Sequence, residues 1–411
     1  MFKNRNFKEI VSWQTVLGFE VHIELETSSK MFCCCPADHF GKAPNTQVCP
    51  VCLGLPGTLP VPNARAIEWC IKLGLALGCQ VNLFSKFDRK NYFYPDLPKG
   101  YQITQYNIPF CHDGELLGHK ITRVHLEEDT AKLQHQENMT LIDFNRSGVP
   151  LVEVVTEADF KDSDDSDVFL KELQQIIRAL GISSADMEKG SMRLEANISI
   201  KRPEHPDLPD YKVEVKNVNS FKFIKKAIDY EVTRQIQLLE SGQIPVQETR
   251  GFKESTGETV SQRAKEEAND YRYFPEPDIP PLQFTEAQIE SWRSELPVLP
   301  ARVREELVNR YQLSSQYAVI ISSDPDMYAK FLKNPSKATA NALVNKRPLQ
   351  TTQSAEVDRE VVSKVLIANP KAVADLKSGK QQALFFLIGQ IKKELGDVDV
   401  ALVKRTVEEL I

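Results

Sequence analysis

The sequence lacks the segments that would place a chain in or across a membrane. No apolar run reaches the ~20 residues of a membrane-spanning helix. Its first residues, MFKNRNFKEIVSW, contain no apolar stretch like that of a secretory signal peptide. We therefore expect a cytoplasmic protein that has no membrane partner.

Common signatures of nucleotide binding and hydrolysis are also absent. The chain contains no G-x-x-x-x-G-K-[ST] loop, no G-x-G-x-x-G motif after a strand and no G-x-S-x-G nucleophile elbow. A Gly/Ser-rich amidase segment is missing too. Any nucleotide must therefore bind without a P-loop, and the chain offers no obvious nucleophile for hydrolysing glutamine.

The chain also lacks a strong net charge. The 411 residues include 51 basic and 57 acidic side chains, which gives a net charge of −6. A mildly acidic chain has no general attraction for nucleic acid, so a polyanion would have to bind a local patch. The length allows two or three domains.

Cysteine, in contrast, is concentrated: five of the eight cysteines fall within residues 32–52. Cys33 and Cys35 form one close pair, and Cys49 and Cys52 form another. In a reducing compartment such pairs favour a metal site over disulfides, and four thiolates suit tetrahedral structural zinc. Cys34 makes the pairing ambiguous, and reduced cysteines without metal are the alternative. A four-thiolate site would brace a loop and leave no position for a substrate.

The first two-thirds of the chain shows the alternating pattern of half-buried strands. Apolar and polar residues alternate in four segments, which are 19–26, 122–129, 191–200 and 211–217, and a fifth segment, 150–157, carries Glu153 within an apolar run. Glu128 falls on the apolar side of its segment unless a bulge turns it. Strands with one apolar and one polar face predict a largely antiparallel sheet that is packed on one side and open on the other.

Helical patterns separate these strands and then dominate the C-terminal part. Helices are predicted at 63–78, 166–180 and 221–241, and a proline-dense segment at 273–282 ends the strand-rich part. We predict an α+β fold with three domains: an N-terminal, mainly antiparallel-sheet, cradle-like catalytic domain with helices (1–282), an all-α region (283–350) and a small helical tail (351–411). The tail pattern indicates three amphipathic helices beyond residue 357.

Carboxylates gather on the polar faces of the predicted strands. The candidates are Glu20, His22, Glu127, Glu128, Glu153 and Glu195. Like charges on one side of a sheet repel unless cations neutralise them, and hard oxygen ligands select Mg²⁺ or Mn²⁺ beside phosphates. The alternative is an ordinary solvated face with unrelated carboxylates.

Cationic and aromatic residues interleave in 87–107 and again in 270–278. Such stretches hold phosphates and stack bases, although packed connections have the same composition. The first stretch contains Arg89, Lys90 and Tyr94, and Arg263 and Lys265 precede the second.

Taken together in this order, several motifs resemble the GatB family, which forms one of the subunits of the aspartyl/glutamyl-tRNA amidotransferases. They include GFEVHIEL, CPVCLGLPG, KFDRKNYFYPDLPKGYQIT, HLEEDTAKL, NRSGVPLVEVV, VEVKNVNSFKF and KEEANDYRYFPEPD. The resemblance is dense over about 1–282 and extends to 369–390 in the tail.

The resemblance implies an ATP-dependent ligase that uses glutamine as amide donor. A protein of this family binds Mg-ATP, phosphorylates the side-chain carboxylate of Glu-tRNA(Gln) or Asp-tRNA(Asn), and lets ammonia displace the phosphate. Ammonia would come from a separate amidase subunit (GatA), and a small third subunit (GatC) would hold both in a heterotrimer. The missing amidase signature is consistent with this division.

Carried over by motif, the resemblance assigns roles to individual residues. It implies catalytic roles for Glu20, His22, Glu127, Glu128 and Glu153, with the first four as magnesium ligands, and zinc at Cys33, Cys35, Cys49 and Cys52. ATP or the acceptor end would contact Lys86, Arg89, Lys90, Tyr94, Arg193, Glu195, Arg263 and Lys265.

The chain also departs from the family pattern. Glu195 stands where the family has the shorter aspartate, and the helical region after 331–346 is shorter than usual, so we expect altered tRNA contacts. The rival interpretations are a stand-alone metallohydrolase and a non-catalytic, zinc-stapled, tRNA-binding component of the same kind of complex.

Overall fold

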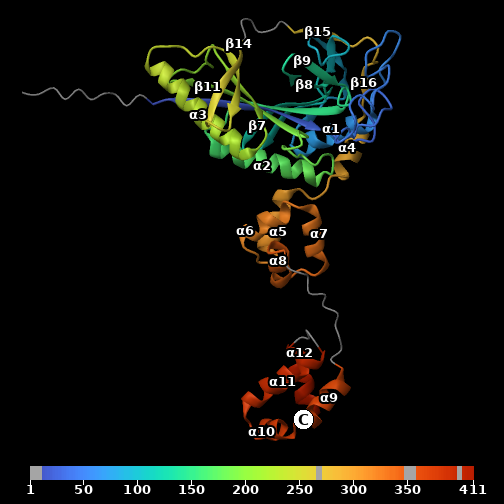
Figure 1. Cartoon of the computed structure of the whole chain (residues 1–411), viewed down its shortest axis with the longest axis vertical. Helices are drawn as coiled ribbons and strands as arrows, with labels where there is room; N and C mark the ends of the chain where they lie inside the picture. The colour runs from blue at the N-terminus through green and yellow to red at the C-terminus, as the bar shows by residue number, and fades with distance from the viewer. Residues whose placement is uncertain (1–11, 265–270, 347–357, 396–399) are drawn as a thin grey trace, which may run out of the picture. The chain divides into compact units, whose positions relative to one another are not determined.

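The computed structural model describes residues 12–264, 271–346, 358–395 and 400–411. The chain divides into two compact units, with the division between Ala340 and Asn341. Figure 1 draws the whole chain, coloured from its N-terminus to its C-terminus. In the described ranges, no helix is both long and apolar enough to cross a membrane.

A nine-stranded sheet forms the centre of the first unit. Its strands are β1 (Gln14–Glu24), β2 (Gln80–Val81), β6 (Cys111–Leu116), β7 (His119–Glu128), β10 (Pro150–Thr156), β11 (Met192–Lys201), β12 (Val213–Val218), β13 (Glu248–Lys253) and β14 (Glu258–Ala264). Their order is β14-β13-β12-β11-β1-β10-β7-β6-β2. Neighbouring strands are antiparallel except β12 and β13, which are parallel. The predicted α+β class with a mainly antiparallel sheet is confirmed.

Three helices cover one face of this sheet (Figure 1). They are α1 (Ala64–Ala76), α2 (Ser163–Ala179) and α3 (Phe221–Glu240). Asn63, Asp162 and Ser220 cap their first turns by accepting backbone N–H groups. Apolar residues of β1 such as Phe19 and Val21 are at most 1% exposed and belong to the core that these helices close. The other face of the sheet therefore carries the polar side chains.

Shorter strands and loops lie on the side opposite these helices (Figure 1). They are β3 (Phe84–Ser85), β4 (Asp88–Asn91), β5 (Tyr101–Thr104), β8 (Lys132–Gln136), β9 (Met139–Asp143), β15 (Arg272–Pro275) and β16 (Leu282–Gln283). They pair as β15-β4-β5, β16-β3 and β8-β9. The cysteine-rich loop is joined to the β8-β9 hairpin because Asn45 bonds Asp143 and Ile142 at 2.9 and 3.0 Å.

Short helices complete the first unit. They are α4 (Glu286–Ser294), α5 (Pro300–Asn309), α6 (Ser315–Ser322), α7 (Pro325–Lys333) and α8 (Lys337–Val344). Arg304 of α5 lies 2.7 Å from Glu172 of α2, which ties these helices to the sheet domain. The division between the units falls within α8. The boundary predicted at residue 350 lies outside the described residues.

The second unit contains α9 (Arg359–Ala368), α10 (Pro370–Lys377), α11 (Gln381–Leu395) and α12 (Val400–Leu410). Val362, Leu387, Ile391 and Val403 form the centre of its own apolar core and are completely buried. The prediction of three helices was wrong for the described residues, because Pro370 cannot continue α9 and instead starts α10.

Candidate functional site

The strand register brings polar residues together in rows across the open face of the sheet. His22 on β1 lies opposite Arg193 on one side and Glu153 on the other, and Glu153 lies opposite His125. Glu20 similarly lies opposite Glu195. The alternating pattern could place these residues on polar faces, but only the strand order makes them neighbours.

His22, Glu127 and Glu153 form one group of close ligand atoms. The His22 Nε2 lies 3.8 Å from the Glu127 Oε1 and 3.7 Å from the Glu153 Oε2. Glu127 and Glu153 are 4% and 7% exposed. The hydroxyl of Thr104 donates to Glu127 at 3.1 Å, and the His125 Nε2 lies 3.2 Å from Glu153.

Burial and mutual repulsion shape the ionisation of this group. Burial raises the pKa of Glu127, and the Glu153 carboxylate raises it further. Burial opposes ionisation of Glu153, but His125 and His22 outweigh it and lower the pKa of Glu153. Burial also opposes a charged His22, yet Glu153, Glu195 and Glu127 together raise the pKa of that ring. Two buried carboxylates beside one imidazole are a suitable ligand set for a divalent cation.

Glu20, Glu195 and Glu214 form a second group on the same face. The Lys216 Nζ lies 2.8 Å from Glu195 and 3.4 Å from Glu214. The amide of Asn197 donates to Glu20 at 2.9 Å, while its buried oxygen has no hydrogen-bond partner in the described structure. An unpartnered amide oxygen beside three carboxylates fits a hard cation. The two groups draw on five consecutive strands, β12-β11-β1-β10-β7.

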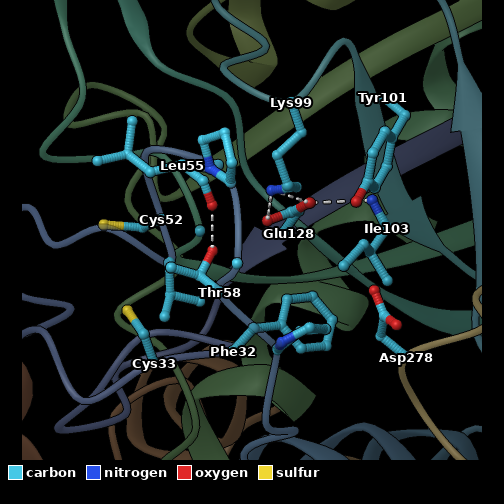
Figure 2. Close-up of a pocket in the computed structure, with 16 residues that line it drawn as sticks. Phe32, Cys33, Cys52, Leu55, Thr58, Lys99, Tyr101, Ile103, Glu128 and Asp278 are labelled. Atoms are coloured by element: carbon cyan, nitrogen blue, oxygen red, sulfur yellow. Dashed lines mark hydrogen bonds and ion pairs between the residues drawn. The ribbon is translucent and has the colours of Figure 1, made fainter.

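Glu128 belongs to neither group. Its carboxylate bonds the Lys99 Nζ at 2.8 Å and the Ile103 N–H at 3.0 Å, next to a pocket of about 200 Å³ lined by the cysteine-rich loop (Figure 2). Side chains alternate along β7, so Glu128 points away from the face that carries Glu127. The four predicted magnesium ligands therefore do not meet: His22 and Glu127 share one group, Glu20 joins the other, and Glu128 is held apart.

Lys90 approaches the first group from β4. Its Nζ lies 4.7 Å from the ring centroid of Tyr271, and burial, which disfavours its charge, is outweighed by Glu127, Tyr273 and Glu153, so its pKa is raised. Tyr273 in turn stacks on Tyr106 with ring centroids 4.1 Å apart. A cation and stacked aromatic rings thus border the acidic face.

The four predicted zinc ligands come together. The Sγ atoms of Cys33, Cys35, Cys49 and Cys52 all lie within 4.8 Å of one another, whereas Cys34 is exposed and outside the group. A hydrogen bond from Cys33, with contributions from the Cys49 N–H and Lys30, lowers the pKa of Cys52 to about 4 despite its burial. The same hydrogen bond raises the pKa of Cys33, and burial raises the pKa of Cys35 to about 11. Zinc binds cysteine sulfur as thiolate, and the short distances among the four sulfur atoms fit a tetrahedral site for it.

Comparison with known proteins identifies the family to which these features belong. A model described as the GatB/GatE catalytic domain matches residues 15–290, and one described as a GatB domain matches residues 322–411. The chain belongs to the GatB family. Both carboxylate groups and the cysteine cluster lie within the matched GatB catalytic domain.

Full-length relatives are named as the B subunits of aspartyl/glutamyl-tRNA(Asn/Gln) amidotransferases. That of Thermomicrobium roseum is 40% identical, covering 98% of this chain and 99% of its own length. Those of Carboxydothermus hydrogenoformans and Thermotoga maritima are 41% and 38% identical, over 93% and 97% of this chain and 95% and 99% of their own lengths. The first match extends over 479 positions, more than the 411 residues here, so that GatB relative contains segments that this chain lacks.

Several residues predicted to bind ATP or the acceptor end of tRNA are engaged elsewhere in this GatB domain. Arg89 binds both oxygens of Glu276 at 2.7 and 2.8 Å. Lys86 forms an ion pair with Asp88.

The other predicted residues differ in their surroundings. Arg193 bonds Asp129 at 2.7 Å and also lies opposite His22 in the strand register. Tyr94 is 49% exposed. Arg263 lies opposite Thr249 on β14, and Lys265 lies outside the described residues.

The sequence analysis did not select three residues that the GatB sheet brings to the site. Glu214 and Asn197 occupy polar positions of alternating strands and could have been found from that pattern. His125 also follows the alternation of its strand, between Arg123 and Glu127. Their neighbours come from distant parts of the chain, so the pattern alone could not distinguish these positions from other polar ones.

Proposed function

We propose that this chain is the activating subunit of a glutamine-dependent aminoacyl-tRNA amidotransferase. It would convert Glu-tRNA(Gln), Asp-tRNA(Asn) or both to the amidated forms, in the cytoplasm. The observation that carries this proposal is the convergence of two carboxylate groups from five adjacent strands within a region matched by a GatB catalytic-domain model. The names of the relatives supply the substrate class.

The chemistry explains why such a face is needed. A side-chain carboxylate resists ammonia because it is anionic and has no good leaving group. Its oxygen attacks the terminal phosphorus of ATP, the bond to the bridging oxygen breaks, and ADP leaves with the electron pair. Ammonia then attacks the acyl carbon and releases inorganic phosphate. Catalysis of phosphoryl transfer consists mainly of positioning and of neutralising charge.

The two carboxylate groups would hold divalent cations such as Mg²⁺. When bound, these cations would neutralise phosphate charge during transfer. Glu127 and Glu153 would be held in place by Thr104 and His125, and Asn197 would orient Glu20 through their 2.9 Å hydrogen bond. Lys90 would add a fixed positive charge at the border of the site.

Structural zinc at the four cysteines would brace the loop that borders the Glu128 pocket. The amidase partner GatA would supply ammonia, and the small partner GatC would join the two in a heterotrimer. The helical region (283–350) and the tail (351–411) would bind the body of the tRNA. The lack of an amidase signature in this chain supports this division of labour.

Reconstitution tests the proposal. The purified chain is combined with GatA and GatC, mischarged tRNA, ATP and glutamine, and amidated tRNA is measured. Glu127→Gln should lower the rate by ~100-fold or more, because it removes a ligand of the phosphoryl-transfer site. Glu290→Gln, at an exposed position on α4, is the matched control. Undiminished amidation by the Glu127 variant would place the active site elsewhere.

ATP consumption distinguishes the rival interpretations. A non-catalytic tRNA-binding component would show no ATP cleavage that depends on the mischarged tRNA. A stand-alone metallohydrolase would be active without GatA and GatC. We expect ADP formation that requires Glu-tRNA or Asp-tRNA.

A further inference from the structure

Two tyrosine rings lie at the border of the acidic face and have no role in either carboxylate group. Tyr106 and Tyr273 stack with ring centroids 4.1 Å apart and an angle of 13° between the ring planes. Tyr106 is 52% exposed, so its ring packs on Tyr273 on one face and is otherwise largely open to solvent. An exposed ring that is already supported from one side is suited to stack on a further flat ring. We call these two residues the tyrosine pair.

Neighbouring strands hold the tyrosine pair in place. The backbone N–H of Tyr106 donates to the Asp88 Oδ2 at 3.1 Å, and Asp88 is 1% exposed. Tyr273 belongs to β15 and lies opposite Lys90 of β4 in the strand register. Tyr271 packs edge-on against Tyr273, with ring centroids 6.4 Å apart. Because the two rings are fixed before any ligand arrives, a ligand that stacks on them has little side-chain ordering to offset.

The tyrosine pair lies next to the group of His22, Glu127 and Glu153. The hydroxyl of Thr104 donates to Glu127 at 3.1 Å, and Tyr106 follows Thr104 by two residues. Two residues of chain span at most about 7 Å. The strand that carries Tyr273, β15, lies on the side of the sheet opposite the covering helices, which is the side of the open face (Figure 1). A ring stacked on Tyr106 would therefore lie close to this carboxylate group.

We propose that the tyrosine pair is a stacking platform for the adenine of the terminal nucleotide of the tRNA acceptor end. This inference rests on the proposed function and adds how the RNA substrate is held. The terminal nucleotide is unpaired, so its base is free to stack on an aromatic side chain. The proposed substrates are two different tRNAs, and a platform for the adenosine that ends every tRNA would serve both.

The position of the platform favours this adenine over the adenine of ATP. The amino acid to be amidated is esterified to the terminal ribose, so its side-chain carboxylate lies within the length of one amino acid from that nucleotide. In ATP, a ribose and two phosphate groups separate the adenine from the phosphorus that is attacked. The platform is connected to Glu127 through Thr104. The short reach of the aminoacyl group therefore matches a platform beside the reacting groups.

Binding of a short RNA by the full chain in complex with GatA and GatC tests the platform. The probe is an acceptor-stem RNA that carries glutamate through a stable amide in place of the ester, and a second probe lacks only the terminal adenine. Fluorescence anisotropy would measure the affinity of each probe, and calorimetry that of a non-hydrolysable ATP analogue. Tyr106→Ala should weaken binding of the complete probe about tenfold. It should leave the second probe and the ATP analogue within about twofold, because that probe has no base to stack.

Further variants separate stacking from misfolding. Tyr106→Phe keeps the ring and should retain the affinity for the complete probe, whereas Tyr106→Leu keeps apolar volume without a flat ring and should weaken it. Tyr230→Ala, at a partly buried tyrosine of α3 on the helix-covered side of the sheet, is the matched control and should change neither affinity.

Three results would overturn the platform. They are full affinity for the complete probe in both Tyr106→Ala and Tyr106→Leu, equal losses with the two probes, and a loss confined to the ATP analogue, which would assign the tyrosine pair to the nucleotide. Amidation by the unsubstituted complex is scored separately. Binding that depends on both the terminal adenine and Tyr106 would support the platform even in a complex that failed to amidate, so failure of the proposed function is recognised by itself.

Discussion

Glu20 and His22 are two residues apart on β1, yet they belong to different carboxylate groups. Glu20 contributes to the group with Glu195 and Glu214, whereas His22 contributes to the group with Glu127 and Glu153. A single strand thus bridges two candidate cation sites. Paired cations that clamp the attacking and leaving oxygens are a recurrent solution for phosphoryl transfer.

The first prediction is that the chain has two separable classes of site for divalent cations. Glu20→Gln should weaken Mn²⁺ binding at one class, and Glu127→Gln at the other, by about tenfold each, because each removes one charged ligand. Mn²⁺ titration followed by electron paramagnetic resonance would count the sites. Glu290→Gln serves as the control for loss of a negative charge. Loss of both classes in either single variant would show that the groups form one site.

Replacing Cys52 by serine should release the metal from the cysteine cluster, whereas Cys34→Ser should retain it. Cys52 contributes a thiolate within the group, and Cys34 is exposed outside it. Metal content by mass spectrometry and the thermal unfolding temperature are the measurements. Equal metal content in the two variants would contradict a four-cysteine site.

The Lys99–Glu128 pair should contribute strongly to stability. The two side chains are only 13% and 5% exposed, and Lys99→Met would leave the Glu128 carboxylate with the Ile103 N–H but without its cation. We expect a loss of ~3 kcal/mol in the free energy of unfolding, measured with urea. Lys99→Met combined with Glu128→Gln should recover part of this loss. An additive double variant would indicate that the pair is not coupled.

The stability contributed by Glu231 should depend on pH. This carboxylate is completely buried on α3, which opposes its ionisation, but hydrogen bonds from Arg234, Gln235 and Thr259 lower its pKa overall. Its stabilisation is therefore fully present above the unfolded pKa of about 4.3 and is lost as the pH falls through the lower folded pKa.

Glu231→Gln measures this contribution. The variant should be less stable than the unsubstituted chain by ~2 kcal/mol at neutral pH, and the difference should shrink below about pH 4. Urea unfolding at a series of pH values, with Glu290→Gln as the exposed control, checks it. A difference that grows on acidification would show that folding raises the pKa of Glu231 instead of lowering it.

Alternation in the sequence predicted which residues of each strand face away from the core. It assigned Glu20, His22 and Glu127 to polar faces correctly, since apolar neighbours such as Val21 are buried. Glu153 lies within an apolar run, where alternation gives no assignment. The period of two also placed Glu128 on the opposite side. What alternation cannot supply is strand order, and the division into two groups depends on β12 and β11 lying beside β1.

The sequence was equally unable to predict ion pairs between distant segments of the chain. Arg89 was predicted to bind ATP or the tRNA acceptor end, but its bidentate partner Glu276 is 187 residues away. Glu195 has one more methylene than the aspartate of the family pattern, and it still reaches the group with Glu20 while bonding Lys216. Local composition indicated charge at these positions, and only the fold shows which charges neutralise one another.

Removal of residues 350–411 tests the proposal that the tail binds tRNA while the first unit carries out the chemistry. This segment contains all of the described tail helices and their separate apolar core, while both carboxylate groups lie in the first unit. Linked binding surfaces raise each other's effective concentration, so loss of the tail should raise the KM for full-length mischarged tRNA by about tenfold or more. Turnover of a minimal aminoacylated acceptor stem should change less than about twofold, because a short stem makes no use of the tail. Leu387→Ala, which disrupts the tail core without shortening the chain, should reproduce the KM effect in part. Equal losses with both substrates would mean that the tail supports the chemistry itself.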